Sequence, residues 1–363
     1  MRIPINDEIT KLLKIFHKFM RIIWFRLKII SIMDAEIDGI FQRKRIKGLM
    51  IIINMGMKIL PIVLMLLLTN FDFSDMSIKD DAFHDELPIH IETWYFESIF
   101  KNNESIVFII TSLSNKNNGI LMVGFHFYKN GIIIYEKRKI YSKFFLSNQT
   151  PYIVVNGKEI LKGFLKNGKI CYNLSYSIYN FSFELNFENK TKGWKSDKWL
   201  AIPNMEVNGY IYMNGKTGRV EGKGYHDHNI FFLWEPFIER GYIDGKIIAN
   251  NFSIFWARLM GLFHHEDFVI FSESSYMLIK NVTIKCYNYK LNHGRLIPTS
   301  FHIFAKNKNL SINITIHSTS IHFIHLPLIK YWQYHINARG GIRDNKLVKI
   351  DTNDIMEYML FQI

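Results

Sequence analysis

The feature that most constrains this chain is a succession of short apolar runs separated by tight turns. From about residue 88 onward, runs rich in Ile, Val, Tyr and Phe recur roughly every ten residues, the spacing expected of an all-β protein. Asn-Gly pairs favour two-residue hairpin turns, and they stand between several of these runs, at 130–131, 156–157, 167–168 and 214–215. Residues 182–187 alternate between polar and apolar side chains. The pattern predicts an antiparallel sandwich or barrel.

The same texture continues through the second half of the chain. Stretches such as YIDGKIIANNFSIFWARLMG and LSINITIHSTSIHFIH have the composition of strands. The chain has 363 residues, of which 48% are hydrophobic, so it can bury two cores of ordinary size. We therefore expect an all-β protein with two consecutive antiparallel units, each a sandwich or a barrel, at residues 83–239 and 240–363, preceded by N-terminal helices.

The first 47 residues differ from this pattern. Residues 8–33 carry apolar side chains at helical spacing on one face and lysines and arginines on the other. A basic amphipathic helix that contains a tryptophan, here Trp24, is typical of membrane-surface binding. The alternative is a helix that docks on the rest of its own chain.

Residues 48–82 form an apolar segment and a linker. The run 49–70 is about long enough to span a bilayer, although Lys58 and Pro61 interrupt it. Basic residues precede the run and acidic residues follow it, which would leave the N-terminus cytoplasmic and the body outside. A signal peptide starting at Met55 or Met57, or a buried or interfacial helix, would fit as well. We expect membrane association through residues 1–70, with a cytoplasmic location as the alternative.

Charge and cysteine content exclude several classes of protein. The formal net charge is +13, yet no nucleic-acid-binding motif accompanies it, so we expect no nucleic-acid partner. The abundance of Lys, Ile and Asn is what AT-rich codon usage would give. With only Cys171 and Cys286 present, we expect neither a disulfide framework nor a cysteine zinc site.

The stretch GKGYHDHNIFFLWEP, residues 222–236, sets a tyrosine, two histidines, an aspartate and an asparagine in consecutive positions, 225–229. In a strand, alternate side chains share a face. Tyr225, Asp227 and Asn229 would then point to one side, and His226 and His228 to the other. Burial beside a tyrosine in an aromatic cavity would raise the pKa of an aspartate, which could keep its proton near neutral pH and act as a general acid.

Two other interpretations of this stretch stay open. His226 and His228 could hold a metal ion together with later residues of the cluster His264, His265, Glu266 and Asp267. Alternatively, the two histidines bond across strands or to the second domain, while Asp227 and Asn229 cap turns. Because histidines are frequent in this chain, we expect no metal.

Several segments together resemble the lipocalin-like carotenoid 1,2-hydratases, also called hydroxyneurosporene synthases, and their AttH-like and fungal pericyclase relatives. GKGYHDHN resembles the signature of this family, and IETWYFES at 91–98 looks like its opening strand. The stretch 198–229, FWARLMG at 255–261 and YWQYHINARGGI near the end resemble further strands of the family. The resemblance covers roughly residues 84–363.

The resemblance implies two lipocalin-like β-barrels with a ligand cavity near their junction, hydrophobic ligands of isoprenoid or polyene type, and no organic cofactor. Tyr225 and Asp227 match the family's Tyr-x-Asp pair, and Trp199 matches the tryptophan of its His-x-Trp pair. Asp197 stands where the family has that histidine, and the His-Asp-His version of the motif also departs from the hydratases.

The leading hypothesis is a hydratase or cyclase in which Asp227 donates the proton to a C=C bond and Tyr225 orients it. Trp199, Trp234 and Trp256 would line the pocket. We expect the further ligand-binding residues to be Trp94, His226, His228, Asn229 and Arg258. The alternatives are a carrier or sensor of a hydrophobic ligand that performs no turnover, and a structural protein of the membrane surface. The sequence leaves the oligomeric state open.

Overall fold

A computed structural model describes residues 73–362, except 116–117, 238, 262–264, 327–328 and 345. The chain divides into two compact units, residues 1–71 and 72–363, and the described residues belong to the second. The predicted helical segment 1–47 and the apolar run 49–70 lie outside the described residues. Within the described residues, no helix has the length and apolar character needed to cross a membrane.

The described part of the chain is built almost entirely of antiparallel strands, which confirms the predicted all-β class. Thirteen strands form the first sheet, in the order β5-β4-β3-β2-β13-β12-β10-β9-β8-β7-β6, with β11 added to β12 and β1 to β11. Its elements are β1 (Ser74–Asp75), the 3₁₀ turn η1 (Ile78–Asp81), β2 (His90–Phe100), β3 (Glu104–Asn115), β4 (Asn118–Lys129), β5 (Ile132–Tyr141), β6 (Phe144–Leu146), β7 (Tyr152–Val155), β8 (Lys158–Lys166), β9 (Lys169–Ile178), β10 (Phe181–Asn189), β11 (Trp194–Lys195), β12 (Trp199–Met213) and β13 (Lys216–Phe232).

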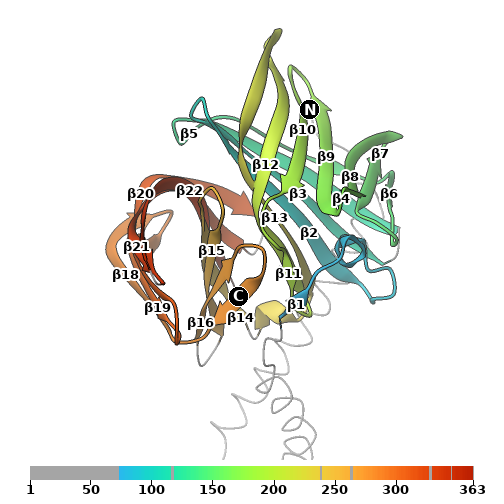
Figure 1. Ribbon diagram of the computed structural model, residues 1–363. Helices are drawn as coiled ribbons and strands as arrows, with labels where there is room; N and C mark the ends of the chain where they lie inside the picture. The colour runs from blue at the N-terminus through green and yellow to red at the C-terminus, as the bar shows by residue number, and fades with distance from the viewer. Residues whose placement is uncertain are drawn as a thin grey trace, which may run out of the picture. The chain divides into compact units, whose positions relative to one another are not determined.

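Nine strands form the second sheet, in the order β17-β16-β15-β14-β22-β21-β20-β19-β18. Figure 1 shows it curling around its own interior beside the first sheet. Its elements are η2 (Glu235–Phe237), β14 (Glu239–Ile248), β15 (Ser253–Gly261), β16 (His265–Ser272), β17 (Tyr276–Ile279), β18 (Val282–Asn292), β19 (Arg295–Lys306), β20 (Ser311–Leu326), β21 (Ile329–Arg343) and β22 (Leu347–Phe361). The division of residues 83–363 into two independent domains stays a prediction.

The four Asn-Gly pairs singled out in the sequence are four of the hairpin turns of the first sheet. Both residues of each pair have positive φ, for example 51° at Asn130 and 75° at Gly131. Asparagine and glycine tolerate this conformation, and the resulting turn matches the twist of the flanking strands. These turns join β4 to β5, β7 to β8, β8 to β9 and β12 to β13. The Asn-Gly turn at 214–215 therefore helps to set the register between β12 and β13, the strand that carries most of the stretch 222–236.

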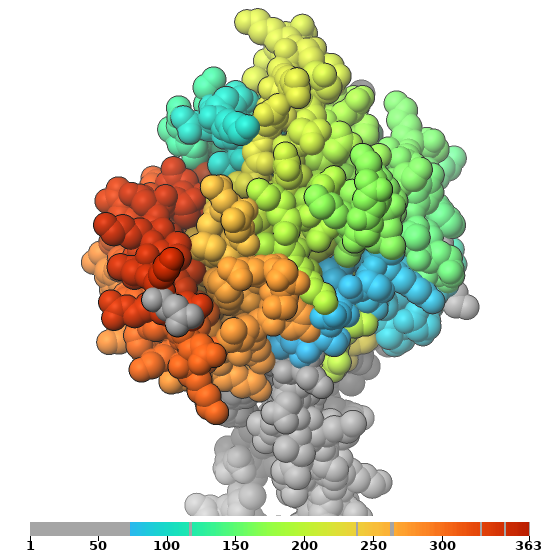
Figure 2. Space-filling view, viewed as in Figure 1, coloured from blue at the N-terminus to red at the C-terminus, as the bar shows by residue number. Residues whose placement is uncertain are grey.

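The buried side chains form a core inside each sheet and a third layer between the two sheets. On β2, Trp94 and Phe96 point into the first core, whereas Tyr95 points to the layer between the sheets. On β15, Trp256 points into the second core and Phe255 to the layer. Figure 2 shows the orange and red atoms of the second sheet meeting the green and yellow atoms of the first along one boundary.

We call this third region the inter-sheet layer. Its apolar members come from both sheets and are Tyr95, Val107, Tyr128, Trp194, Ala201, Tyr225, Ile248, Phe255, Ala257, Phe268, Ile270 and Ile355. Because strand β13 is central in the first sheet, it is buried on both faces where it passes between β2 and β12. The two-residue period of a strand therefore places alternate residues of the stretch 222–236 in the first core and in the inter-sheet layer.

Candidate functional site

Strand β13 presents Tyr225, Asp227 and Asn229 to the inter-sheet layer. The Tyr225 hydroxyl donates a hydrogen bond of 2.8 Å to Oδ2 of Asp227. The Asn229 side-chain amide donates one of 2.9 Å to Oδ1. All three residues lie within the strand, so Asp227 and Asn229 bond to each other rather than cap a turn.

Burial controls the ionisation of Asp227. The residue is only 5% exposed. Desolvation, reinforced by the negative charge of Glu357, raises the pKa of Asp227 to about 7, against the opposing hydrogen bond from Tyr225. Burial and the neighbouring Asp227 also raise the pKa of the Tyr225 hydroxyl, which therefore stays protonated. Near neutral pH, a large fraction of Asp227 carries its proton and can serve as a general acid.

The aspartate shares the inter-sheet layer with other buried charges. Glu97 on β2, Asp244 and Lys246 on β14, and Glu357 on β22 are all buried. Lys246 forms an ion pair with Glu97 at 2.5 Å, and its ammonium lies 4.4 Å from the centre of the Tyr225 ring. Sequence reasoning expected a single buried carboxyl here and missed this group.

Desolvation acts on the whole group. It raises the pKa of Glu97 to about 7 even with Lys246 alongside, and it raises the pKa values of Asp244 and Glu357 as well. A signal for these residues was present in the sequence, because each charged residue interrupts an otherwise apolar strand, as in YIDGKII and DIMEYML. Charges in such positions are rare unless they are paired.

A row of aromatic rings crosses the inter-sheet layer beside Asp227. Trp199 on β12 packs edge-on against Trp194 at 5.4 Å and against Phe255 at 5.0 Å between ring centres. Phe255 in turn stacks parallel to Tyr225 at 6.2 Å. Ring faces of this kind stabilise a nearby cation.

The opposite face of β13 points into the first core, where His226 and His228 meet two buried carboxylates. Nε2 of His226 lies 2.9 Å from Oδ2 of Asp81, and its ring stacks on Phe96 at 4.0 Å. Nε2 of His228 lies 2.9 Å from Oε2 of Glu92, and its Nδ1 lies 3.1 Å from Oδ1 of Asp81. Both histidines are therefore held by acidic groups within the first sheet.

These contacts set the charges of the cluster. Burial alone would raise the pKa of Asp81, but the two histidines hold it at about 2. Burial alone would also raise the pKa of Glu92, but His228, His84 and His90 hold it well below its usual range. Burial alone would lower the pKa of His228, yet the two carboxylates raise it to about 9. Trp94 completes this face, because its ring stacks on His228 at 4.4 Å and its indole N–H donates to the Asp81 carbonyl at 3.0 Å.

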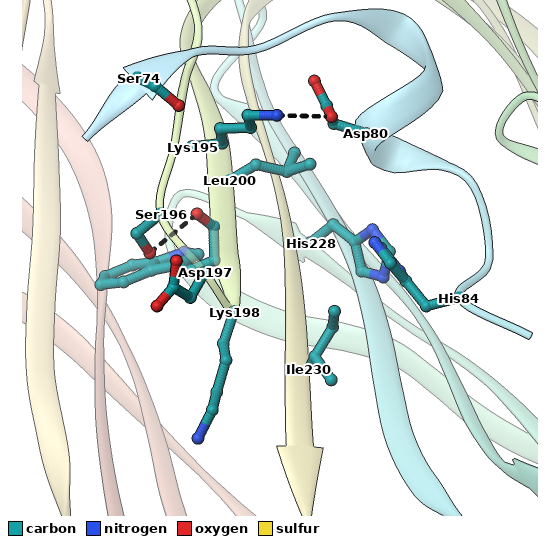
Figure 3. Close-up of a pocket in the computed structure, with 11 residues that line it drawn as sticks. Ser74, Asp80, His84, Lys195, Ser196, Asp197, Lys198, Leu200, His228 and Ile230 are labelled. Atoms are coloured by element: carbon teal, nitrogen blue, oxygen red, sulfur yellow. Dashed lines mark hydrogen bonds and ion pairs between the residues drawn. The ribbon is translucent and has the colours of Figure 1, made fainter. Parts of the chain in front are cut away.

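A cavity of about 210 Å³ opens between η1, the loop before β12, and β13 (Figure 3). Asp197, Trp199, His84 and His228 line it, together with Lys195 and Lys198. Lys195 is paired with Asp80 at 2.7 Å, and Lys198 with Glu235. Pockets that enclose drug-sized ligands are larger, at about 300–1,000 Å³. This cavity therefore suits a small molecule or one end of a longer one.

The structure separates the three tryptophans that were expected to share one pocket. Trp199 lines the cavity, whereas Trp256 points into the second core against Phe301, at 5.7 Å. Phe255, one residue earlier on β15, faces the inter-sheet layer instead and stacks on Tyr225, because adjacent residues of a strand face opposite ways. Trp234 is 40% exposed and stacks on Phe232.

Arg258 also lies on the inward face of the second sheet. Its guanidinium makes two hydrogen bonds of 2.7 Å to the carboxylate of Asp267 on β16. The sequence offered Asp267 as a possible metal ligand. In the structure its carboxylate pairs with the Arg258 guanidinium instead.

A different group has the composition of a metal site. Candidate ligand atoms of His84, Glu92 and His228 all lie within 4.8 Å of one another. Sequence reasoning missed His84 and Glu92, because neither stands at a recognisable spacing from the motif. The pairing of β2 with β13 brings Glu92 close to His228, and His84 joins them from the segment between η1 and β2.

Comparisons with known proteins identify the fold. No protein-family model matches the sequence, and no curated protein sequence matches it. An AttH-like protein from Nitrosomonas europaea superposes with a TM-score of 0.53 and 10% identity, covering 78% of this chain and 96% of its own. Kievitone hydratase from Nectria haematococca gives 0.51 and 10%, covering 77% and 93%. CghA in complex with Sch210972 gives 0.52 and 7%, covering 76% and 89%. At these identities the likeness concerns the fold, and the predicted lipocalin-like architecture is confirmed.

Proposed function

We propose that this chain is a lipocalin-like hydratase or cyclase that acts, without an organic cofactor, on a C=C bond of a hydrophobic, isoprenoid-type ligand. The observation that carries the proposal is the Tyr225–Asp227 pair, a carboxyl 5% exposed with a pKa raised to about 7. A fold shared with a kievitone hydratase supports the same class of reaction.

The proposed reaction is an acid-assisted addition. The Asp227 carboxyl donates its proton to one carbon of the double bond, which leaves a carbocation on the other carbon. The faces of Tyr225 and Phe255 stabilise that charge. Water, or a second double bond of the same ligand, then attacks the cation. The proton released after this attack returns to the Asp227 carboxylate, so the enzyme is regenerated.

A carrier or sensor of a hydrophobic ligand is the second candidate. Two observations favour it. Asp197 lines the cavity, and at this sequence position the hydratases that the chain resembles have a histidine. In addition, the buried charges around Asp227 join strands of both sheets, as a purely structural network would. A carrier needs a ligand site but no proton donor.

Purification of the full chain from its own host, followed by native mass spectrometry and lipid extraction, tests the proposal. We expect a co-purifying isoprenoid-type lipid that the protein converts to a product heavier by one water or to a cyclic isomer. A bound lipid that returns unchanged after prolonged incubation would favour the carrier. Protein that carries no lipid and converts none would contradict both functions.

The pH dependence of turnover gives an independent prediction. Because the reaction needs the protonated form of Asp227, whose pKa is raised to about 7, turnover should be high below that pH and fall as the pH rises through it. The measurement is the turnover rate across the neutral range at saturating ligand. A rate that rises through neutrality would contradict the role of Asp227 as the acid.

We also propose that residues 1–75 attach the protein to a membrane. The amphipathic segment 8–33 and the apolar run 49–70 support this proposal. After cell lysis and ultracentrifugation, we expect the full-length protein in the membrane pellet. Release by high salt would indicate surface attachment, and release only by detergent would indicate insertion. Full-length protein that remains in the supernatant would contradict attachment.

A further inference from the structure

We propose that His84, Glu92 and His228 form a binding site for a divalent transition-metal ion of the zinc class, open to the cavity beside Trp199. The site is separate from Asp227, because it lies on the other face of β13, and it does not depend on the proposed function. Two imidazoles and one carboxylate, with a further position left for a small ligand, are a donor set that zinc and its neighbours prefer, whereas magnesium and calcium prefer oxygen donors.

The spacing of the donor atoms fits one ion. Nε2 of His228 lies 2.9 Å from Oε2 of Glu92, and Nδ1 of His84 lies 3.3 Å from Oε1 of the same carboxylate. In a tetrahedral site with bonds of about 2.0–2.1 Å, neighbouring ligand atoms are about 3.3 Å apart. Candidate atoms from all three residues lie within 4.8 Å of one another. Only small side-chain adjustments are needed to surround an ion.

The groups that contact the three proposed ligands are those expected around a metal ion. Metal-bound histidines usually direct their other ring nitrogen to a carboxylate or a carbonyl, which fixes the orientation of the ring. Nδ1 of His228 lies 3.1 Å from Oδ1 of Asp81, so this relationship is in place. Nε2 of His90 lies 2.7 Å from Oε1 of Glu92, and the His84 backbone N–H donates to that oxygen at 2.9 Å. The central carboxylate is therefore held from several sides.

His84 places a ring nitrogen beside the cavity. Its Nδ1 is shielded from solvent and lies 3.3 Å from Oε1 of Glu92. The rest of the ring is partly exposed, and His84 and His228 both line the cavity. Figure 3 shows the two rings side by side at its wall. An ion bound between them would leave its open position toward the cavity, where water or a small ligand could bind.

Charge balance favours a cation at this point. Asp81 and Glu92 are both fully buried. Buried carboxylates require compensating positive charge. A divalent ion bound by His84, Glu92 and His228 would supply it.

Titration of the metal-free full-length protein with Co²⁺, and separately with Zn²⁺, tests the site. We expect one ion per chain, the strong visible absorption of tetrahedral cobalt, and a raised Tm with either ion. H84A should lose the cobalt spectrum and the Tm shift, and D81N should weaken zinc binding by about 10- to 100-fold. H302A is the matched control, because His302 is a histidine of the second sheet that bonds only to Asn313 among the contacts described for it, and it should bind as the unaltered protein does.

His84 is partly exposed, so H84A should fold, which circular dichroism would verify. The spectral signal does not depend on enzymatic activity, and the result is therefore independent of the proposed function. If the unaltered protein binds no cobalt or zinc, the proposal is wrong. Equal binding by H84A and the unaltered protein would assign the ion to another site and would also overturn it.

Discussion

Replacement of Asp227 by asparagine should abolish turnover and leave ligand binding nearly unchanged. This result is expected because asparagine matches the size and hydrogen-bonding pattern of a protonated aspartate but cannot donate a proton to carbon. General acid catalysis contributes about 10²- to 10⁴-fold to a rate, so D227N should lose at least that much. Steady-state turnover and equilibrium binding of the extracted lipid are the two measurements.

D227N should also remain folded. Burial raises the pKa of Asp227 above that of an unfolded aspartate, so the ionised form is unfavourable in the native state. The stability cost of the aspartate therefore grows as the pH rises from the unfolded value toward about 7. Asparagine never ionises and avoids this cost, and the Tm of D227N near neutral pH should equal or exceed that of the unaltered protein.

D244N is the matched control for this experiment. Asp244 is another buried carboxyl of the inter-sheet layer with a raised pKa, but no hydrogen bond to Tyr225 is described for it. D244N should therefore retain turnover. Full activity in D227N, or an equal loss in both variants, would contradict the assignment of the acid to Asp227.

Y225F separates orientation from proton transfer. The Tyr225 hydroxyl lowers the pKa of Asp227 by donating to it. Without this bond the pKa of Asp227 should rise further, and the decline of turnover with pH should move to more alkaline values. A tyrosine with a purely structural role would change stability without moving the pH profile.

Features that depend on neighbouring residues were predictable from the sequence. Strand alternation and Asn-Gly turns are encoded locally, so the all-β class and the hairpins of the first sheet could be inferred without knowledge of the sheet order. The same two-residue period predicted that Tyr225 and Asp227 share one face and that His226 and His228 share the other.

Features that depend on distant residues were not predictable in this way. Glu97 and Glu357 reach the inter-sheet layer only because β2 pairs with β13 and β14 pairs with β22. Asp81 reaches His226 from the short turn η1, 145 residues away in the sequence. Sequence spacing carries no information on such contacts.

The sequence also did not reveal that Phe255, rather than Trp256, faces the inter-sheet layer. Both faces of β15 are buried at this point, one in the second core and one in the inter-sheet layer. A run of apolar residues buried on both sides shows no alternation, and its facing cannot be read from the pattern. Local sequence therefore identified the strand but not which aromatic residue meets Tyr225.

Replacement of Lys246 by methionine should destabilise the protein, and more so at alkaline pH. The lysine side chain is 3% exposed and pairs with Glu97, whose side chain is 2% exposed. Removal of one partner of a buried ion pair costs about 3–5 kcal/mol, because the other charge is left without compensation. The full cost should appear only where Glu97 would be ionised in the unaltered protein.

The sign of the pH dependence follows from the pKa of Glu97. With Lys246 present, burial already raises this pKa to about 7. Below that value Glu97 is largely protonated in both proteins, and K246M should lose little stability. Above it, the unaltered protein holds an ion pair, whereas K246M must either keep the proton on Glu97 or bury a lone carboxylate. The difference in unfolding free energy should therefore widen as the pH rises through about 7.

Urea unfolding at pH values on either side of neutrality measures this difference. The double variant K246M/E97Q removes both charges and should recover most of the stability lost in K246M at alkaline pH. K223M is a second comparison, because Lys223 pairs with the buried Asp354 across the same two sheets but is 25% exposed, so water can compensate for its loss in part. If K246M were as stable as the unaltered protein at alkaline pH, the pair of Lys246 and Glu97 would not contribute to holding the two sheets together.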